Sequence, residues 1–144
     1  MTFLLDVNIL LILHDPRHQH YKLVSRWFTQ PPSRPFATCP ITESGMLRLL
    51  LQGVTGLDPF DMQEARDALQ RLVQLPGHVY WPDHPAYLDA TSPLFARMQG
   101  HRQTTDAYLL GLAIHNKGKL ATLDRGIAHL AGREFAANLE IIRL

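Results

Sequence analysis

The stretch that decides the fold is "FLLDVNILLIL", residues 3–13. Its first three residues are apolar and are followed at once by Asp6, which predicts a short strand with a carboxylate at its carboxyl end. The apolar run over residues 7–13 then predicts the start of a helix. The chain is therefore expected to begin with a strand followed directly by a helix.

The same stretch is apolar enough to resemble an export signal, but two features oppose that interpretation. No basic segment precedes it, and Asp6 and Asn8 interrupt it. It is also shorter than the ~20 residues that a membrane helix needs. The single cysteine, Cys39, cannot form an internal disulfide, which favours a reducing compartment. We therefore expect a cytoplasmic protein without a membrane span.

Length and composition predict one globular domain over residues 1–144. The chain is 46% hydrophobic and 19% charged, values typical of a packed core and not of a disordered segment.

Strands and helices are expected to alternate along the rest of the chain. Further strands are predicted at residues 36–39, 78–81, 118–124 and 139–144. Helices are predicted at about residues 20–30, 40–53, 61–77, 85–100 and 104–116. This order predicts an α/β protein, a three-layer α/β/α sandwich with a short central parallel sheet. In such sheets, ligands bind beyond the carboxyl ends of the strands, where the strand order reverses.

Four acids lie where these elements begin or end. Asp6 and Asp124 each follow a predicted strand, Asp106 lies at a helix start, and Glu43 lies in the first turn of the helix that begins at Pro40. The carboxyl ends of parallel strands meet at one edge of the sheet, so the four carboxylates are expected to converge there.

Each acid also has a simpler, local explanation. Asp106 suits the first turn of a helix capped by Thr104 or Thr105, where the helix dipole favours the ionised acid by ~0.3–1 kcal/mol. Asp124 lies in "LDRG", a natural turn, and Glu43 suits a solvated helix start. Asp6 is the hardest to explain locally, because it interrupts a strongly apolar stretch. Spacing alone leaves both explanations open.

If the acids do converge, their charges need compensation. Like charges held a few ångströms apart repel each other, more strongly in apolar surroundings, so such a cluster takes up protons or cations. Oxygen ligands without a Cys or His set favour Mg²⁺ or Mn²⁺ over zinc. Divalent ions held by carboxylates are typical of phosphodiester hydrolysis.

The charge balance leaves room for a polyanionic partner, although the net charge is only +1. If four of the 13 acids bind metal, nine remain against 14 basic residues, a surplus of five positive charges elsewhere. Arg102 and Arg125 are the foremost candidates for contact with a polyanion because they lie close in sequence to Asp106 and Asp124. Ordinary solvation is the alternative for each of them.

Four segments together resemble the PIN-domain ribonucleases, specifically the VapC toxins of bacterial toxin–antitoxin pairs. The segments, which span nearly the whole chain in this order, are "FLLDVNILLIL", "PITESGMLRLL", "GHRQTTDAYLLGLA" and "GKLATLDRG".

The resemblance implies a metal-dependent endoribonuclease that uses Mg²⁺, with Mn²⁺ as the other candidate ion. It implies that Asp6 and Asp106 bind the metal and that Asp124 and Glu43 complete the acidic site. Asn8 and Thr105 match polar positions near the metals, where hydrogen-bonding roles are expected.

The resemblance further implies an RNA substrate, a homodimer and a small cognate antitoxin that covers the acidic site with a basic side chain. Apolar faces of residues 23–28 and 62–73 are candidates for a groove that receives a partner helix, with core packing as the alternative.

Two other functions stay open at this point. One is an aspartyl-phosphate phosphatase with Asp6 as the nucleophile, although such enzymes favour a second acid where this chain has Asn8. The other is a PIN-like module that binds RNA or a protein without cutting.

Overall fold

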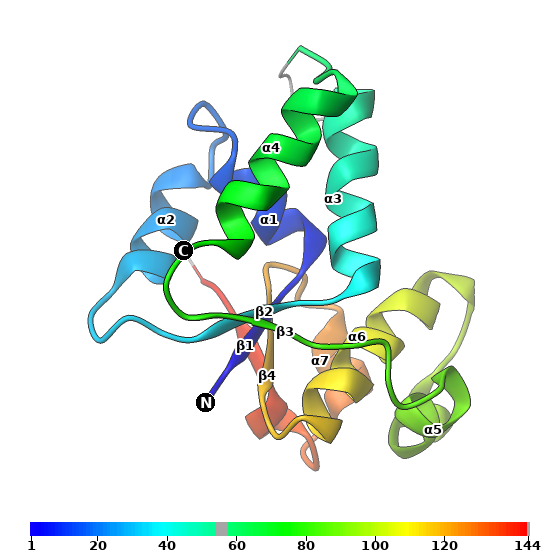
Figure 1. The fold of residues 1–144 in the computed structure, drawn as a ribbon. Coiled ribbons are helices and arrows are strands. Elements are labelled where there is room, and N and C mark those ends of the chain that lie inside the picture. The colour runs from blue at the N-terminus through cyan, green and yellow to red at the C-terminus, as the bar shows by residue number, and fades with distance from the viewer. Residues whose placement is uncertain (54–57, 144) are drawn as a thin grey trace.

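Five short parallel strands form the centre of the molecule (Figure 1). The computed structural model describes residues 1–53 and 58–143. The strands are β1 (Phe3–Leu5), β2 (Phe36–Thr38), β3 (His78–Tyr80), β4 (Lys119–Thr122) and β5 (Leu139–Ile141). Their order in the sheet is β3-β2-β1-β4-β5, with every neighbouring pair parallel. The predicted parallel sheet is confirmed; Leu144, the end of the last predicted strand, lies outside the described residues.

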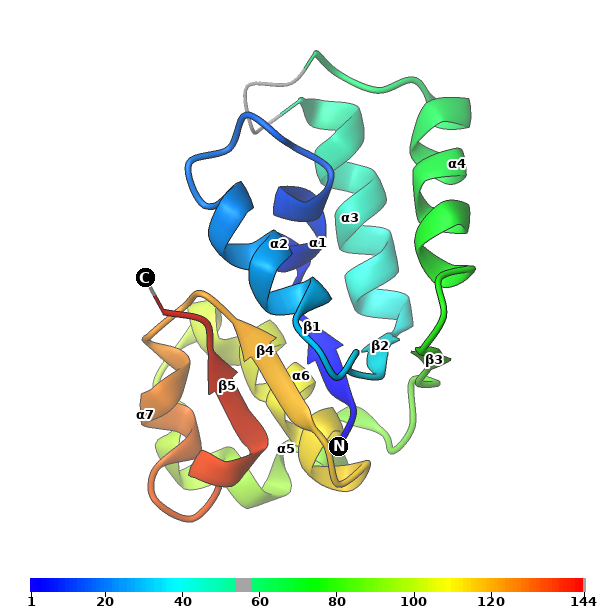
Figure 2. The same ribbon diagram turned by 90° about the vertical axis from the view of Figure 1, so that its left-hand side faces the viewer.

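Helices cover both faces of this sheet, which confirms the three-layer sandwich (Figures 1 and 2). One layer contains α1 (Val7–Leu13), α2 (Tyr21–Thr29), α3 (Pro40–Gln52) and α4 (Met62–Val73). The other contains α5 (Tyr87–Thr91), α6 (Thr104–His115) and α7 (Ile127–Ala131). Side chains on a strand point alternately to the two faces, so Phe3 and Leu5 pack into the core beneath α1–α4, whereas Leu4 packs into the core beneath α5–α7.

The strand order reverses at β1. From this central strand the chain first builds outward through β2 and β3, and it later returns to the other side of β1 to add β4 and β5. Leu5 pairs with Ala121, and the backbone N–H of Asp6 donates to the carbonyl of Ala121 at 3.0 Å. The residues that follow β1 and β4 therefore emerge side by side at the switch point of the sheet, where open α/β folds bind ligands.

Helix α3 begins and ends as the sequence predicts. Pro40 occupies its first position, and the hydroxyl of Thr42 accepts the backbone N–H of Cys39 at 3.0 Å. The helix ends at Gly53, which adopts the left-handed conformation with φ 69°.

A glycine inside α3 allows this helix to pack closely on α1. A Cβ atom added to Gly45 would lie 2.8 Å from Cγ2 of Val7, closer than such atoms approach in proteins. Val7 directly follows Asp6, and Glu43 lies two residues before Gly45. This contact therefore sets how near the start of α3 comes to the end of β1.

The structure corrects the predicted helices in three places. Residues 85–100 do not form one long helix: α5 ends at Thr91 and a 3-10 helix continues over Ser92–Arg97, with Pro93 at its second position. Helix α7 was not predicted, because five residues are too few to show a helical period. Helix α4 ends at Val73, four residues before the predicted end at Gly77. Among the described residues, no helix combines the length and apolar character needed to cross a membrane.

Candidate active site

Asp6 is a buried acid at the switch point, only 8% exposed. Its Oδ1 accepts the backbone N–H of Val7 at 2.7 Å, so it caps α1, and its Oδ2 accepts the hydroxyl proton of Thr122 at 2.7 Å. Burial raises the pKa of Asp6 and the charge of Asp124 adds to this, while the two hydrogen bonds act in the opposite direction. Asp6 is therefore held in one orientation in an environment that penalises its charge.

Thr122 connects Asp6 to Asp124. The Thr122 hydroxyl, which donates to Asp6, accepts the backbone N–H of Asp124 at 3.0 Å. One oxygen of the exposed Asp124 accepts the backbone N–H of Gly126 at 2.8 Å, so Asp124 also makes the turn expected for "LDRG". Sequence reasoning missed Thr122, although its place two residues before an acid at a strand end was a usable signal.

Asp106, in the first turn of α6, completes a group of three acids with Asp6 and Asp124. Burial, which is the largest cause, and the charges of Asp6 and Asp124 together raise the pKa of Asp106 to about 6. The position of Asp106 at a helix start therefore does not keep its pKa at the ordinary value, because burial and two like charges act in the opposite direction to the helix dipole. These shared charge effects place the three acids in one electrostatic site, which we call the three-acid group.

The start of α6 also differs from the prediction that Thr104 or Thr105 caps it. A 3-10 turn over His101–Gln103 leads directly into the helix, so the cap position falls on Gln103. The hydroxyl of Thr104 donates to the carbonyl of His101 at 2.9 Å, and the backbone N–H of Thr104 donates to the same carbonyl. The preceding turn thus supplies the acceptor for the first helical N–H, and no side-chain cap bond is formed.

Glu43 has partners of its own on the neighbouring strands. Its Oε2 accepts the hydroxyl proton of Thr38 at 2.6 Å, and the Thr38 oxygen lies 2.8 Å from Nε2 of His78. Burial lowers the pKa of His78, and the charge of Glu43 opposes this. Glu43 is not among the charges that act on Asp6 or Asp106. Sequence reasoning missed both Thr38 and His78.

The remaining predicted site residues are all exposed. Asn8 lines a groove of about 310 Å³ together with His18, His20 and Leu123. Leu123 directly precedes Asp124 in sequence, but none of the three acids lines this groove. The other exposed residues are Thr105 at the start of α6, Arg102 in the preceding 3-10 turn, and Arg125 directly after Asp124.

The three-acid group fits a hard divalent cation by its chemistry. It offers only carboxylate and hydroxyl oxygens, and burial together with neighbouring like charges raises the pKa of Asp6 and of Asp106, an effect that a bound cation would oppose. In the part of the chain that the structure describes, no three Asp, Glu, His or Cys side chains form a ready-made metal cage. Mg²⁺ commonly keeps several water ligands and binds through one or two carboxylates, so it does not require such a cage.

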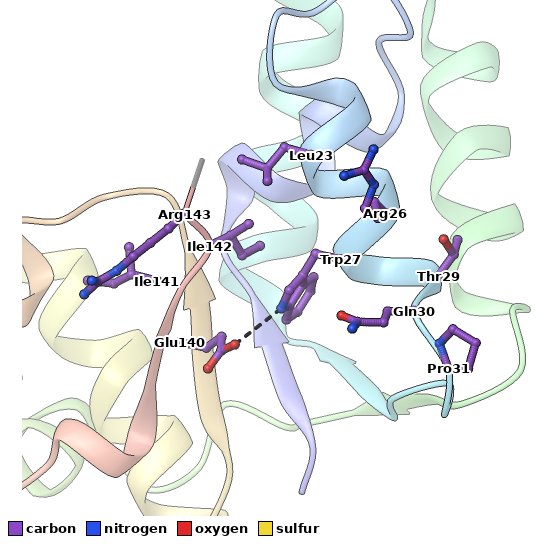
Figure 3. Close-up of a pocket in the computed structure, with 10 residues that line it drawn as sticks. All are labelled: Leu23, Arg26, Trp27, Thr29, Gln30, Pro31, Glu140, Ile141, Ile142 and Arg143. Carbon is purple, nitrogen blue, oxygen red and sulfur yellow. Dashed lines mark hydrogen bonds between the residues drawn. The ribbon is translucent and has the colours of Figure 1, made fainter.

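A separate groove of about 490 Å³ lies between α2 and the edge strand β5 (Figure 3). Leu23 and Trp27 of α2 line it, and the indole N–H of Trp27 donates to Glu140 across it at 3.4 Å. Two cations, Arg26 and Arg143, also line it. The helix over residues 23–28 therefore presents part of its apolar face to a groove, and none of the site acids borders this groove.

Comparison with known proteins places these features in a family. Residues 3–133 match the PIN domain. The chain is 37% identical over 132 residues to ribonuclease VapC29 of Mycobacterium tuberculosis, which covers 92% of each chain. It is 36% identical to ribonuclease VapC39 of the same organism, over 91% of this chain and 94% of the relative. Ribonuclease VapC44 is 35% identical over 89% of each. The chain therefore belongs to the PIN-domain family and, within it, to the VapC group.

Proposed function

We propose that this protein is a divalent-metal-dependent endoribonuclease of the VapC type and acts as the toxin of a toxin–antitoxin pair. The observation that carries the proposal is the three-acid group at the switch point of the sheet. Asp6, Asp106 and Asp124 come from three distant points of the chain, and their charges oppose one another. A protein that maintains such repulsion at the switch point of its sheet is suited to bind a cation there, and the named relatives are ribonucleases.

In this proposal Asp6 and Asp106 hold the metal, and Asp124 and Glu43 complete the acidic site. When bound, Mg²⁺ or Mn²⁺ supplies the positive charge that activates water and stabilises the phosphoryl oxygens during hydrolysis. Thr122 holds the Asp6 carboxylate in place through its 2.7 Å hydrogen bond. Asn8 and Thr105 supply further hydrogen bonds.

Arg102 and Arg125 are the proposed contacts to the RNA backbone. Both are exposed, and both lie close in sequence to an acid of the three-acid group. Arginine donates to phosphate through a planar fork, which suits backbone contacts without sequence selection.

The proposal includes a homodimer and a small antitoxin. An acidic site that lacks positive charge suits capture of a basic side chain from such a partner. The groove between α2 and β5 offers an apolar surface outside the acidic site to which a partner segment can bind.

A cleavage assay with a matched variant tests the proposal. Wild-type protein and Asp106→Asn, purified identically, are incubated with a structured, end-labelled RNA in EDTA, Mg²⁺ or Mn²⁺. We expect internal cleavage by the wild type with either metal and none in EDTA or with Asp106→Asn. Equal cleavage by the two proteins, or cleavage that EDTA leaves unchanged, would contradict it.

Two further measurements separate the nuclease from the two alternatives. A binding module would retain the RNA uncut in every condition, as measured by a mobility shift. A phosphatase would form a phosphorylated Asp6 that is trapped with acid and a small phosphate donor. Both oxygens of Asp6 already accept hydrogen bonds, from Val7 and Thr122, an arrangement suited to a fixed ligand.

A further inference from the structure

Thr38 occupies a position that links Glu43 to the edge of the sheet. It is the last residue of β2, and its side chain is fully buried. Its hydroxyl oxygen lies 2.6 Å from Oε2 of Glu43 and 2.8 Å from Nε2 of His78. Three elements, β2, α3 and β3, thus meet at one hydroxyl group.

The protons of this contact can be assigned by counting donors. A hydroxyl group has one proton to donate, and an ionised carboxylate has none. Thr38 must therefore donate its proton to Glu43. The oxygen of Thr38 then accepts, so His78 must carry a proton on Nε2 and donate it. The result is a directed chain from His78 through Thr38 to Glu43.

The His78 ring is itself held in place. It packs edge-on against Phe36, with ring centroids 5.3 Å apart, and Phe36 lies in the same strand as Thr38. A glutamate side chain has several rotatable bonds and loses much freedom when it is fixed in one rotamer. The chain of donors fixes one oxygen of Glu43 before any ligand arrives.

We propose that Thr38 and His78 are positioning residues for Glu43, which hold its carboxylate oriented for the cation at the acidic site. The inference rests on the proposed nuclease function and extends it to two residues outside the set of acids. Neither residue contacts the substrate or the metal in this scheme. Their effect passes through Glu43 alone.

Paired variants at both positions test this. Thr38→Val keeps the shape of the side chain and removes the hydroxyl, whereas Thr38→Ser keeps the hydroxyl. His78→Phe keeps the aromatic contact with Phe36, and His78→Gln supplies an amide donor. We expect Thr38→Val and His78→Phe to lower kcat for RNA cleavage by about ten- to a hundredfold with little change in KM. The two conservative variants should keep most of the activity.

Two further measurements distinguish positioning from general damage. In a Glu43→Ala background, Thr38→Val should cause no additional loss of activity or of Mn²⁺ affinity by calorimetry. An equal loss with and without Glu43, or a fully active Thr38→Val, would overturn the inference.

The donor chain is also testable without activity. In the metal-free protein at pH 8, long-range ¹H–¹⁵N spectra should show His78 protonated at Nε2, and protonation at Nδ1 alone would contradict the assignment. If wild-type protein fails to cleave RNA while the Nε2 proton is found, the proposed function fails and the hydrogen-bond chain stands.

Discussion

Asp106 and Glu43 occupy similar places in the sequence, each in the first turn of a helix, yet the fold gives them different neighbours. Asp106 is partly buried near two other acids, and burial and their charges together raise its pKa to about 6. Glu43 accepts a hydrogen bond from Thr38, whose hydroxyl is in turn held by His78. An acid in the first turn of a helix is therefore repelled by other acids in α6, whereas in α3 it accepts a hydrogen bond from a neutral hydroxyl group.

The difference indicates where a cation is needed. Two carboxylates that oppose a third become stable together only when a proton or a metal ion neutralises them. Glu43 has its donor already within the protein, so its orientation does not depend on the metal. We therefore expect the three-acid group to be essential for metal binding and Glu43 to make a smaller contribution to activity.

The largest effect should follow from breaking the three-acid group at its buried member. Asp6→Asn keeps a side-chain oxygen that can cap α1 and removes the charge. It should lower the rate of RNA cleavage by about a thousandfold, because a lost metal contact removes several kcal/mol of transition-state stabilisation. Glu43→Gln should lower it less.

Single-turnover rates in saturating Mg²⁺ measure both variants, and circular dichroism checks that both fold. If Glu43→Gln lowered the cleavage rate more than Asp6→Asn, Glu43 would be more important than the three-acid group, and the expectation would be wrong.

An intermediate effect on activity should follow from changing the distance between Glu43 and the three-acid group. Gly45→Ala introduces a Cβ that would lie 2.8 Å from Cγ2 of Val7, so one of the two must move. Because the β-branched side chain of Val7 has few rotamers in a helix, we expect α3 to shift away from α1 and to carry Glu43 with it. Cleavage should fall by about ten- to a hundredfold, since small misplacements of catalytic groups are costly.

The double variant Gly45→Ala/Val7→Ala removes the clash and should recover most of the lost activity, with Val7→Ala alone as the control. No recovery in the double variant, despite normal thermal unfolding, would show that the contact does not set the position of Glu43.

The smallest effect concerns the stability of the metal-free protein. The folded pKa of Asp106 is raised from 3.8 to about 6, so the folded state binds the proton more tightly than the unfolded chain does. Stability must then fall as pH rises between these two values. In EDTA, the Tm of the wild type should decrease more steeply from pH 4 to pH 7 than that of Asp106→Asn. Parallel Tm curves would indicate that the pKa of Asp106 is not raised in the folded protein.

Much of the fold follows from local patterns in the sequence. The strand and helix starts at residues 3–13 and 36–53 were predictable because apolar runs, Pro40 and Gly53 act over a few residues. The 3-10 segment after α5 and the short α7 were not, since their geometry depends on packing against α6. The prediction that a threonine caps α6 was wrong for a related reason: the preceding turn already supplies an acceptor for the first N–H of the helix.

The sequence by itself determined that strands alternate with helices and that four acids lie at the ends of these elements, because both depend on neighbours along the chain. Only the tertiary structure decided which acids meet. Thr122 reaches Asp6 across 116 residues, and His78 reaches Thr38 across 40. Contacts over such separations depend on strand order and on close packing such as that of Gly45 on Val7, and they in turn set the charge environment of each acid.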